Sequence, residues 1–303
     1  MKVAVIDLGT NTFHLIIAEV SPGEDFDILY KGNEPVRLGQ DAINQNIIIP
    51  EAFQRGIETL KQFSTRIAEH GATVVKAIAT SAIRSASNGT DFVDAAKKEA
   101  GIEITVVNGE QEAEYIYQGV RATGVINSMA LIMDIGGGST EFILCNQHMP
   151  IWKKSYNIGA ARLMQAHFNS DPISKEDKQA INNQLHHVID ELKTACSIYK
   201  PSQLIGSAGA FETFAGLILK DQDVKALKCA SIPMPEYQQL SQQLIASTHE
   251  ERTRISGLIP LRVDMIVIAA ILTDYVIQHC GIQQLSLSTY DLKMGVLGSL
   301  KGR

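Results

Sequence analysis

The sequence has few cysteines, and their spacing gives no sign of a zinc site or a disulfide framework. The chain of 303 residues contains four, and none of them lies in a CxxC pair. Zinc sites and disulfide frameworks both show closely spaced or regularly paired cysteines. We therefore expect reduced, structural thiols of the kind found in cytoplasmic proteins. They are Cys145, Cys196, Cys229 and Cys280.

Long apolar runs are also missing. The longest lies between Met265 and Leu272, which is well short of the roughly 18 residues that cross a bilayer. The apolar start of the chain is interrupted by Asp7, too early for the apolar core of a secretory signal peptide. The sequence therefore predicts a cytoplasmic protein without a membrane partner.

An excess of basic charge is absent too. The chain has 27 Lys and Arg against 33 Asp and Glu, a net charge of −6. The surface as a whole therefore does not indicate a nucleic-acid partner, and a polyanionic ligand would need a local basic pocket. With 45% hydrophobic and 20% charged residues, the composition is globular, and the length allows two domains.

What the sequence does contain is an alternation of predicted strands and helices. Residues 3–20 have the pattern of two strands around a tight turn. A helix is predicted over 50–70 and a buried strand over 74–79. Further along, one long helix is predicted between Ser174, which can cap its start, and Pro201, which ends it. This alternation is typical of α/β domains with a largely parallel inner sheet.

The two halves of the chain contain a repeat. The segment "VIDLGTNT" at 5–12 resembles "IMDIGGGST" at 132–140, and "IATSA" at 78–82 resembles "IGSAG" at 205–209. In this alignment the pairs Asp7 and Asp134, and Ser81 and Ser207, are separated by almost the same number of residues. Two pairs at nearly one separation indicate two similarly folded halves.

The repeat suggests a domain organisation. We predict a first domain over residues 1–124 and a second over 125–303, with the equivalent turns facing one cleft. The last segment, from about 288 to 303, can pack back on the first domain. Closure of the two domains about a hinge near 120–128 is expected.

The glycine run of the second copy suggests phosphate binding. Backbone N–H groups at a glycine-rich turn can point together at an anion. The turn consists of Gly136, Gly137 and Gly138, with the hydroxyls of Ser139 and Thr140 directly after it. Asp7 and Asp134, just ahead of the two turns, are placed to hold Mg²⁺ opposite the phosphate oxygens. A glycine-rich hairpin with turn-forming aspartates is the alternative, but the duplication favours a ligand with several phosphates.

Three other segments allow more than one interpretation. In "TSAIRSASN", Thr80 to Asn88 can contact a ligand beyond a strand end, or can cap a helix and lie on the surface. In "GSAGAF", 206–211, the small residues suit either a nucleotide base or sugar, or close helix packing. The helix start in "NGEQEAEYIYQGV" carries Glu110, Glu112 and Glu114, and acids are ordinary there. Spacing alone does not select a catalyst among these three.

Taken together, these segments resemble the exopolyphosphatase and guanosine pentaphosphate phosphohydrolase family of the actin, sugar-kinase and Hsp70 superfamily. The match runs along essentially the whole chain. It is carried by "DLGTNTFHL", "TSAIRSASN", "NGEQEAEYIYQGV", "DIGGGSTE", "NIGAARL", "GSAG" and "LRVD", in the family's order. The resemblance implies an α/β fold of two ribonuclease-H-like (actin-like ATPase) domains around a central cleft, in the short form of the family.

The resemblance also implies roles for particular residues. Glu112 corresponds to the general base, and Glu141 to an acid that orients the attacking water. Asp7 and Asp134 correspond to acids associated with Mg²⁺ or another divalent cation. The phosphate-contacting positions correspond to Thr10, Asn11, Arg84, Asn88, Gly136, Gly137, Gly138, Ser139 and Thr140. Family arginines correspond to Arg37, Arg162 and Arg262, without an assigned role.

The chain departs from the family pattern at four positions. Gln111 replaces an acid beside Glu112, which would lower the pKa of Glu112 relative to family members. Ala210 stands where threonine is usual, and Asp291 and Lys293 stand where glycine and arginine are typical. These departures concern substrate preference more than chemistry.

The resulting functional prediction is a phosphoanhydride hydrolase. It would release terminal orthophosphate from inorganic polyphosphate, guanosine pentaphosphate or both, by in-line attack of water assisted by Mg²⁺. A homodimer is compatible with the family. The alternatives are an ATP-dependent small-molecule kinase of the same superfamily and a non-catalytic sensor that binds a nucleotide alarmone.

Overall fold

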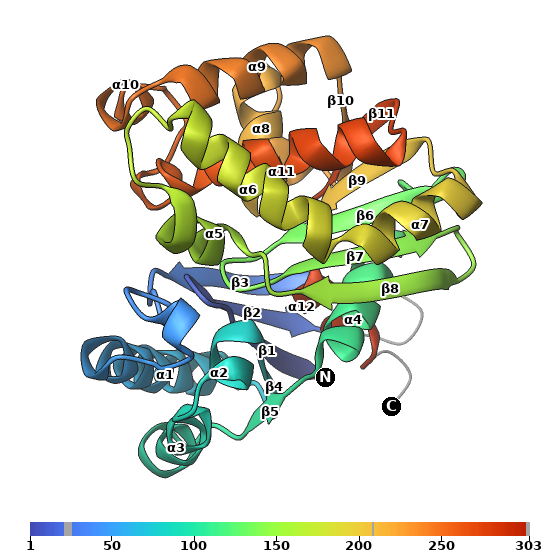
Figure 1. Ribbon diagram of the computed structural model, residues 1–303. Helices are drawn as coiled ribbons and strands as arrows, with labels where there is room; N and C mark the ends of the chain where they lie inside the picture. The colour runs from blue at the N-terminus through green and yellow to red at the C-terminus, as the bar shows by residue number, and fades with distance from the viewer. Residues whose placement is uncertain (21–25, 208, 301–303) are drawn as a thin grey trace. The chain divides into compact units, whose positions relative to one another are not determined.

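The structure is a computed structural model that describes residues 1–20, 26–207 and 209–300. It divides into two compact units. Unit 1 consists of Met1–Gly119 and the C-terminal segment from Leu292, and unit 2 consists of Val120–Asp291. Each unit is described by itself (Figure 1).

Unit 1 is built on a five-stranded sheet in the order β3-β2-β1-β4-β5. The first three strands are antiparallel, whereas β1, β4 and β5 run parallel. The strands are β1 (Lys2–Leu8), β2 (Phe13–Glu19), β3 (Asp27–Glu34), β4 (Val74–Ala79) and β5 (Ile104–Val106). The two strands predicted over 3–20 and the buried strand over 74–79 are thereby confirmed.

The two faces of this sheet are covered by different helices. Ala4, Ile6 and Leu8 of β1 belong to one hydrophobic core together with α1 and α3. Because side chains alternate along a strand, Asp7 lies on the opposite face. There the C-terminal helix α12 packs against β1. The helices of unit 1 are α1 (Pro50–His70), α2 (Ser81–Ser85), α3 (Gly89–Ala95), α4 (Gly109–Arg121, which runs into the start of unit 2) and α12 (Leu292–Gly298), with the 3-10 helix η1 (Ile43–Gln45) and the π-helix η2 (Ala96–Ala100).

The ends of α1 follow the sequence signals. Pro50 occupies the first turn, where its missing N–H costs nothing. Gly71 ends the helix in a left-handed conformation, with φ of 67°, and its N–H bonds to Ala68 and Ile67. The predicted helix is therefore confirmed at both ends.

Unit 2 is built on a six-stranded sheet in the order β10-β11-β9-β6-β7-β8. Strands β6, β7 and β8 are antiparallel, β6, β9 and β11 run parallel, and β10 is antiparallel at the edge. The strands are β6 (Ala130–Ile135), β7 (Thr140–Cys145), β8 (Pro150–Tyr156), β9 (Gln203–Ser207), β10 (Cys229–Ile232) and β11 (Gln284–Ser288).

The helices of unit 2 enclose its main core around α11, which is buried along most of its length. The long helix predicted between Ser174 and Pro201 is two helices, because Ile189 leaves helical geometry and Asp190 starts a new helix. Ser174 caps the first as predicted. The helices are α5 (Ala160–His167), α6 (Lys175–Val188), α7 (Asp190–Tyr199), α8 (Gly209–Ile218), α9 (Met234–Ala246), α10 (His249–Thr253) and α11 (Met265–Cys280), with η3 (Val224–Ala226) and η4 (Pro260–Arg262).

The repeat predicted from the sequence is present in the fold. The order β3-β2-β1-β4-β5 of unit 1 matches β8-β7-β6-β9-β11 of unit 2, with the same parallel and antiparallel neighbours. The predicted class of two related α/β domains is confirmed.

One part of the predicted alignment is wrong. Asp134 pairs with Ser207 on the neighbouring parallel strand, whereas Asp7 pairs with Ile78. Ser207 therefore corresponds to Ile78, three positions before Ser81. Ser207 ends a strand, whereas Ser81 already belongs to helix α2. Counted from the residue paired with the aspartate, β4 extends one residue further than β9. Short motifs of small residues do not reveal such a difference in strand length.

Candidate functional site

The turn after β1 is braced by the segment that follows β3. Gly9 N–H donates to Thr12 O at 3.2 Å, which closes the turn. Thr10 O accepts the N–H of Gly39 at 3.1 Å, and Asn11 O accepts the N–H of Arg37 at 2.8 Å. Thr10 and Asn11, both predicted substrate-binding residues, therefore lie on a turn whose backbone is fixed on its outer side.

Asp7 lies just before this turn and has a basic neighbour from the other end of the chain. Lys293 Nζ of α12 lies 3.8 Å from Asp7 Oδ2, and the two side chains are 13% and 15% exposed. Because both are mostly withdrawn from water, each charge lowers the cost of burying the other. The sequence singled out Lys293 only as a departure from the family pattern.

Arg84 and Glu112 are brought together within unit 1. Arg84 Nη1 donates to Glu112 Oε2 at 2.7 Å and to Val107 O at 3.0 Å, and the Glu112 side chain is only 8% exposed. Of the three acids at the start of α4, Glu112 is buried, whereas Glu110 is exposed. An adjacent guanidinium favours the ionised form of a carboxyl group. The sequence predicted both residues in the site but not this pair.

Gln111, beside Glu112, caps the helix that carries it. Its N–H donates to Asn108 Oδ1 at 2.8 Å, and Asn108 N–H donates to Gln111 Oε1 at 3.0 Å. This reciprocal arrangement is a capping box, which accepts either glutamate or glutamine at the third helical position. The departure at Gln111 therefore has a structural use.

The side-chain amide of Asn88 is hydrogen-bonded to the backbone of Ile48. Its Oδ1 accepts the N–H of Ile48 at 3.0 Å, and its Nδ2 donates to Ile48 O at 2.8 Å. Both ends of the amide thus fix the loop before α1. An amide has a second N–H hydrogen and a second oxygen lone pair, so the predicted contact of Asn88 with substrate is compatible with these two bonds.

The glycine turn of unit 2 has a defined peptide orientation. The carbonyls of Gly136, Gly137 and Gly138 all accept hydrogen bonds from residues 159–162 at the start of α5, at 2.8 to 3.3 Å. In a trans peptide the N–H points away from the preceding carbonyl. The N–H groups of Gly137, Gly138 and Ser139 therefore point away from α5, on one side of the turn.

Two residues of "NIGAARL" make this orientation possible. A Cβ at Gly159 would lie 2.4 Å from the carbonyl carbon of Gly137, so only glycine allows this close approach. The buried Arg162 donates from Nε to Gly138 O at 3.0 Å, and burial lowers its pKa. Arg162 thus braces the turn. Gly159 was not among the predicted site residues, and its signal in the sequence was its place in the family motif.

A transverse row of polar side chains crosses the sheet of unit 2. Asp134 pairs in register with Glu141 on β7 and with Ser207 on β9, and Glu141 pairs with Ser155 on β8. Directly paired residues point to the same face. Ser207 Oγ donates to Asp134 Oδ2 at 3.1 Å, and Ser155 Oγ donates to Glu141 Oε1 at 2.6 Å. Asp134 and Glu141, predicted as metal-binding and catalytic residues, are therefore neighbours in a row bounded by two serines.

Gly209, the first residue of α8 and the last of the "GSAG" motif, is packed against an arginine. Arg262 Nη1 donates to Gly209 O and to Thr213 Oγ1, the latter at 2.6 Å. A Cβ at Gly209 would lie 2.1 Å from Arg262 Nη2. The small residue at this position accommodates the guanidinium, which favours close packing over a nucleotide contact at Gly209.

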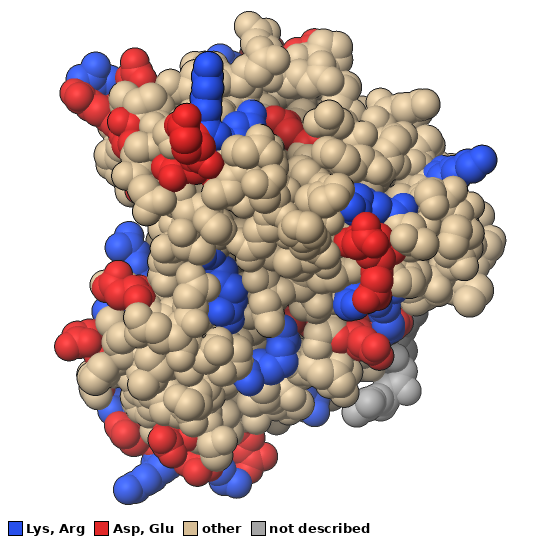
Figure 2. All heavy atoms as spheres, in the orientation of Figure 1, with Lys and Arg blue, Asp and Glu red and all other residues tan. Residues whose placement is uncertain are grey.

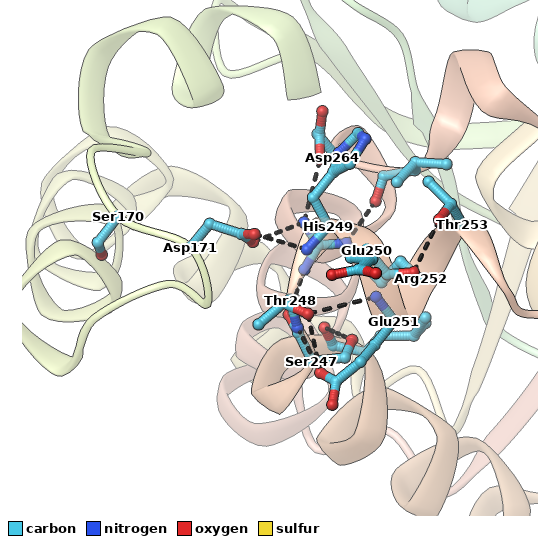
Figure 3. Close-up of polar contacts among 12 residues, drawn as sticks. Ser170, Asp171, Ser247, Thr248, His249, Glu250, Glu251, Arg252, Thr253 and Asp264 are labelled. Atoms are coloured by element: carbon cyan, nitrogen blue, oxygen red, sulfur yellow. Dashed lines mark hydrogen bonds and ion pairs between the residues drawn. The ribbon is translucent and has the colours of Figure 1, made fainter.

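A second arginine fixes the segment that carries Arg262. Arg252 is fully buried, and its guanidinium bonds to Val263 O at 2.7 Å, Asp171 Oδ1 at 2.9 Å and Asp264 Oδ1 at 3.0 Å. Figure 3 shows these groups gathered around the start of α10. Burial opposes ionisation of Asp171, but the N–H of His249 and Arg252 outweigh it and lower the pKa of Asp171. No sequence motif pointed to Arg252.

Within the ranges that the structure describes, no group of three or more His, Cys, Asp or Glu side chains is placed to hold a metal ion. Over the same residues, no helix is both long and apolar enough to cross a membrane. Figure 2 shows basic and acidic side chains interspersed over the face in view.

The fold and the turns define an α/β protein with two ribonuclease-H-like units, each carrying an aspartate and a tight turn at the end of its first strand. Comparison with known families identifies the chain further. Residues 16–303 match the model of the Ppx/GppA phosphatase family. The chain belongs to this family, which confirms the resemblance found in the sequence.

Individual relatives agree with this assignment. A solved exopolyphosphatase from Cytophaga hutchinsonii is 36% identical, with a TM-score of 0.95, and the match covers 99% of this chain and 97% of that one. Exopolyphosphatase 2 of Mycobacterium tuberculosis is 28% identical over 99% of both chains. A guanosine-5'-triphosphate,3'-diphosphate pyrophosphatase of Pseudoalteromonas atlantica is 30% identical over 71% of this chain and 43% of its own length.

Proposed function

We propose that this protein hydrolyses the terminal phosphoanhydride bond of inorganic polyphosphate, guanosine pentaphosphate or both, and releases orthophosphate. Family membership and the names of its relatives support a hydrolase of phosphoric anhydrides. The observation that carries the proposal is the peptide orientation of the turn at Gly136 to Ser139.

That turn has the properties of a phosphate-binding loop. Its carbonyls accept hydrogen bonds from the start of α5. The N–H groups of the peptides that follow these carbonyls therefore point to the opposite side of the turn. Backbone N–H groups that point the same way favour an anion without any basic side chain. We assign phosphate binding to this loop, together with Thr10, Asn11 and Arg84 of unit 1.

The acids of the site fit a magnesium ion that is bound partly by substrate. Mg²⁺ usually keeps several waters and is held by one or two carboxylates plus phosphate oxygens. A site of this kind needs no cluster of three acidic side chains. We assign Asp7 and Asp134 as the residues that would hold it. The ion would neutralise the charge on the phosphate oxygens during the reaction.

Glu112 is the residue we assign as general base. Its carboxyl group is buried and accepts a hydrogen bond from Arg84 at 2.7 Å, which fixes the position of the carboxylate. Glu141 is assigned to orienting the attacking water. The water attacks the terminal phosphorus, its proton passes to Glu112, and the shortened chain leaves with the bridging oxygen.

The proposal predicts a large loss of rate for Glu112→Gln. Removal of a general base lowers kcat by about 10² to 10⁴, with little change in KM. Glu110→Gln on the same helix is the matched control, because Glu110 is exposed, and it should stay near the wild-type rate. The reverse result would move the role of the base to Glu110.

The assay is release of orthophosphate from short polyphosphate, long polyphosphate and guanosine pentaphosphate, each with and without Mg²⁺. Release from at least one of them that depends on Mg²⁺ is the expected result. Tight binding of all three without release would instead favour a sensor. Consumption of ATP only when an acceptor molecule is added would favour a kinase. A cytoplasmic location and a homodimer belong to the same proposal.

A further inference from the structure

We propose that Ser155 is a positioning residue for Glu141 in the reaction, an inference that rests on the proposed function. Ser155 lies on β8, directly opposite Glu141 on β7. Its hydroxyl donates to Glu141 Oε1 at 2.6 Å. Ser155 stands outside every motif that the sequence analysis singled out.

The same carboxylate oxygen accepts a second hydroxyl. Ser139 Oγ, at the end of the glycine turn, donates to Glu141 Oε1 at 2.7 Å. One oxygen is thus held from two sides, by the phosphate-binding turn and by the neighbouring strand. Glu141 is only 2% exposed, and a buried carboxylate depends on such donors for its ionised form and its orientation.

The two serines differ in what else they can do. A hydroxyl has a single proton to donate. Ser139 belongs to the turn that we assign to phosphate binding, so it can donate either to Glu141 or to a bound phosphate. Ser155, on the far strand, keeps Glu141 Oε1 hydrogen-bonded when Ser139 turns to the substrate. The polar row therefore holds the water-orienting carboxylate in one position throughout the reaction.

The test is a pair of variants of almost equal shape, Ser155→Thr and Ser155→Val. Both suit a strand, but only threonine retains the hydroxyl. Ser155→Val should lower kcat about 10-fold or more, the usual cost of removing a supporting hydrogen bond, with KM within about twofold of the wild type. Ser155→Thr should restore most of kcat. A purely structural role would not separate kcat from KM in this way.

Two controls keep the result interpretable. Ser197→Ala removes a hydroxyl that bonds only to its own helix on the surface of unit 2, and it should leave both constants unchanged. Thermal unfolding establishes that each variant is folded, and Ser155→Ala replaces Ser155→Val if valine prevents folding.

The outcomes distinguish the inference from the function on which it rests. If the wild type releases phosphate and the hydroxyl-free variant keeps its kcat within twofold, the role of Ser155 is refuted and the hydrolase stands. If the wild type releases no phosphate from any of the three substrates, the proposed function itself fails.

Discussion

The two units share one sheet arrangement but support the carboxylate at the end of the first strand in different ways. In unit 2, Asp134 has Glu141 on one side and Ser207 on the other. In unit 1, Asp7 has His14 and Ile78 at the same positions. Serine hydroxyls bond to Asp134 and Glu141 of unit 2, whereas a lysine from α12 approaches Asp7 of unit 1.

The difference shows that one fold position can be stabilised by two kinds of interaction. A nearby ammonium acts through its charge, so its effect does not require a bond of fixed geometry. A hydroxyl acts through a directed bond of fixed geometry. The ion pair of unit 1 therefore constrains the position of Asp7 less than the serine hydroxyls of unit 2 constrain Asp134 and Glu141. Single substitutions can distinguish these two kinds of support.

The largest effect on stability is expected for Lys293→Met, which leaves Asp7 without its cation. Breaking a buried ion pair costs up to about 3 to 5 kcal/mol. The residual exposure of this pair reduces the expected loss to about 2 to 4 kcal/mol. Urea unfolding at neutral pH measures it.

Lys293→Arg is the matched variant, since it keeps the charge, and it should lose little stability. Because a largely withdrawn pair is screened only weakly by salt, the loss in Lys293→Met should persist at high salt. A loss in Lys293→Arg as large as the loss in Lys293→Met would refute the electrostatic role of Lys293.

A smaller effect is expected for Ser207→Ala, the counterpart in unit 2. It removes the hydroxyl that donates to Asp134, and a hydrogen bond to a charged group contributes about 1.5 to 3 kcal/mol. The same unfolding experiment measures it. If Ser207→Ala cost more than Lys293→Met, the ranking of the two supports would be reversed.

The smallest effect concerns the Arg252 cluster of unit 2 and appears only in acid. The pKa of Asp171 lies below its usual 3.8, so its contribution to stability is complete above about pH 3.8 and is lost as the pH falls through the lower, folded-state pKa. Asp171→Asn should therefore be less stable than the wild type at neutral pH, and the two should converge near pH 2.

Denaturant unfolding between pH 7 and pH 2 measures this convergence. Glu250→Gln provides the control, because Glu250 is largely exposed and pairs with its helical neighbour Arg254. It should leave the pH dependence unchanged. Parallel curves for wild type and Asp171→Asn would show that Asp171 adds nothing to the acid sensitivity.

Several features of the site were accessible from the sequence because they are local. The strand, turn and strand around Asp7 and Asp134 are encoded within a few consecutive residues, and the duplication made both copies visible. The start of α1 at Pro50 and the cap at Ser174 are equally local. The length of the helix after Ser174 was not predicted correctly, because the helix breaks at Ile189. Both halves have the same apolar spacing, so nothing local in the sequence marks the break.

The α/β class, the repeat, the family and the acids and glycines of the two turns follow from the amino-acid sequence, because each is recognised from short segments of consecutive residues. Tertiary packing was needed to identify the pairs Arg84 with Glu112, Lys293 with Asp7, and Ser155 with Glu141. Strand register and the return of the C-terminal helix bring these partners together. Neither can be read from local pattern, because hydrogen bonds and ion pairs form between side chains that are near in space and distant in sequence.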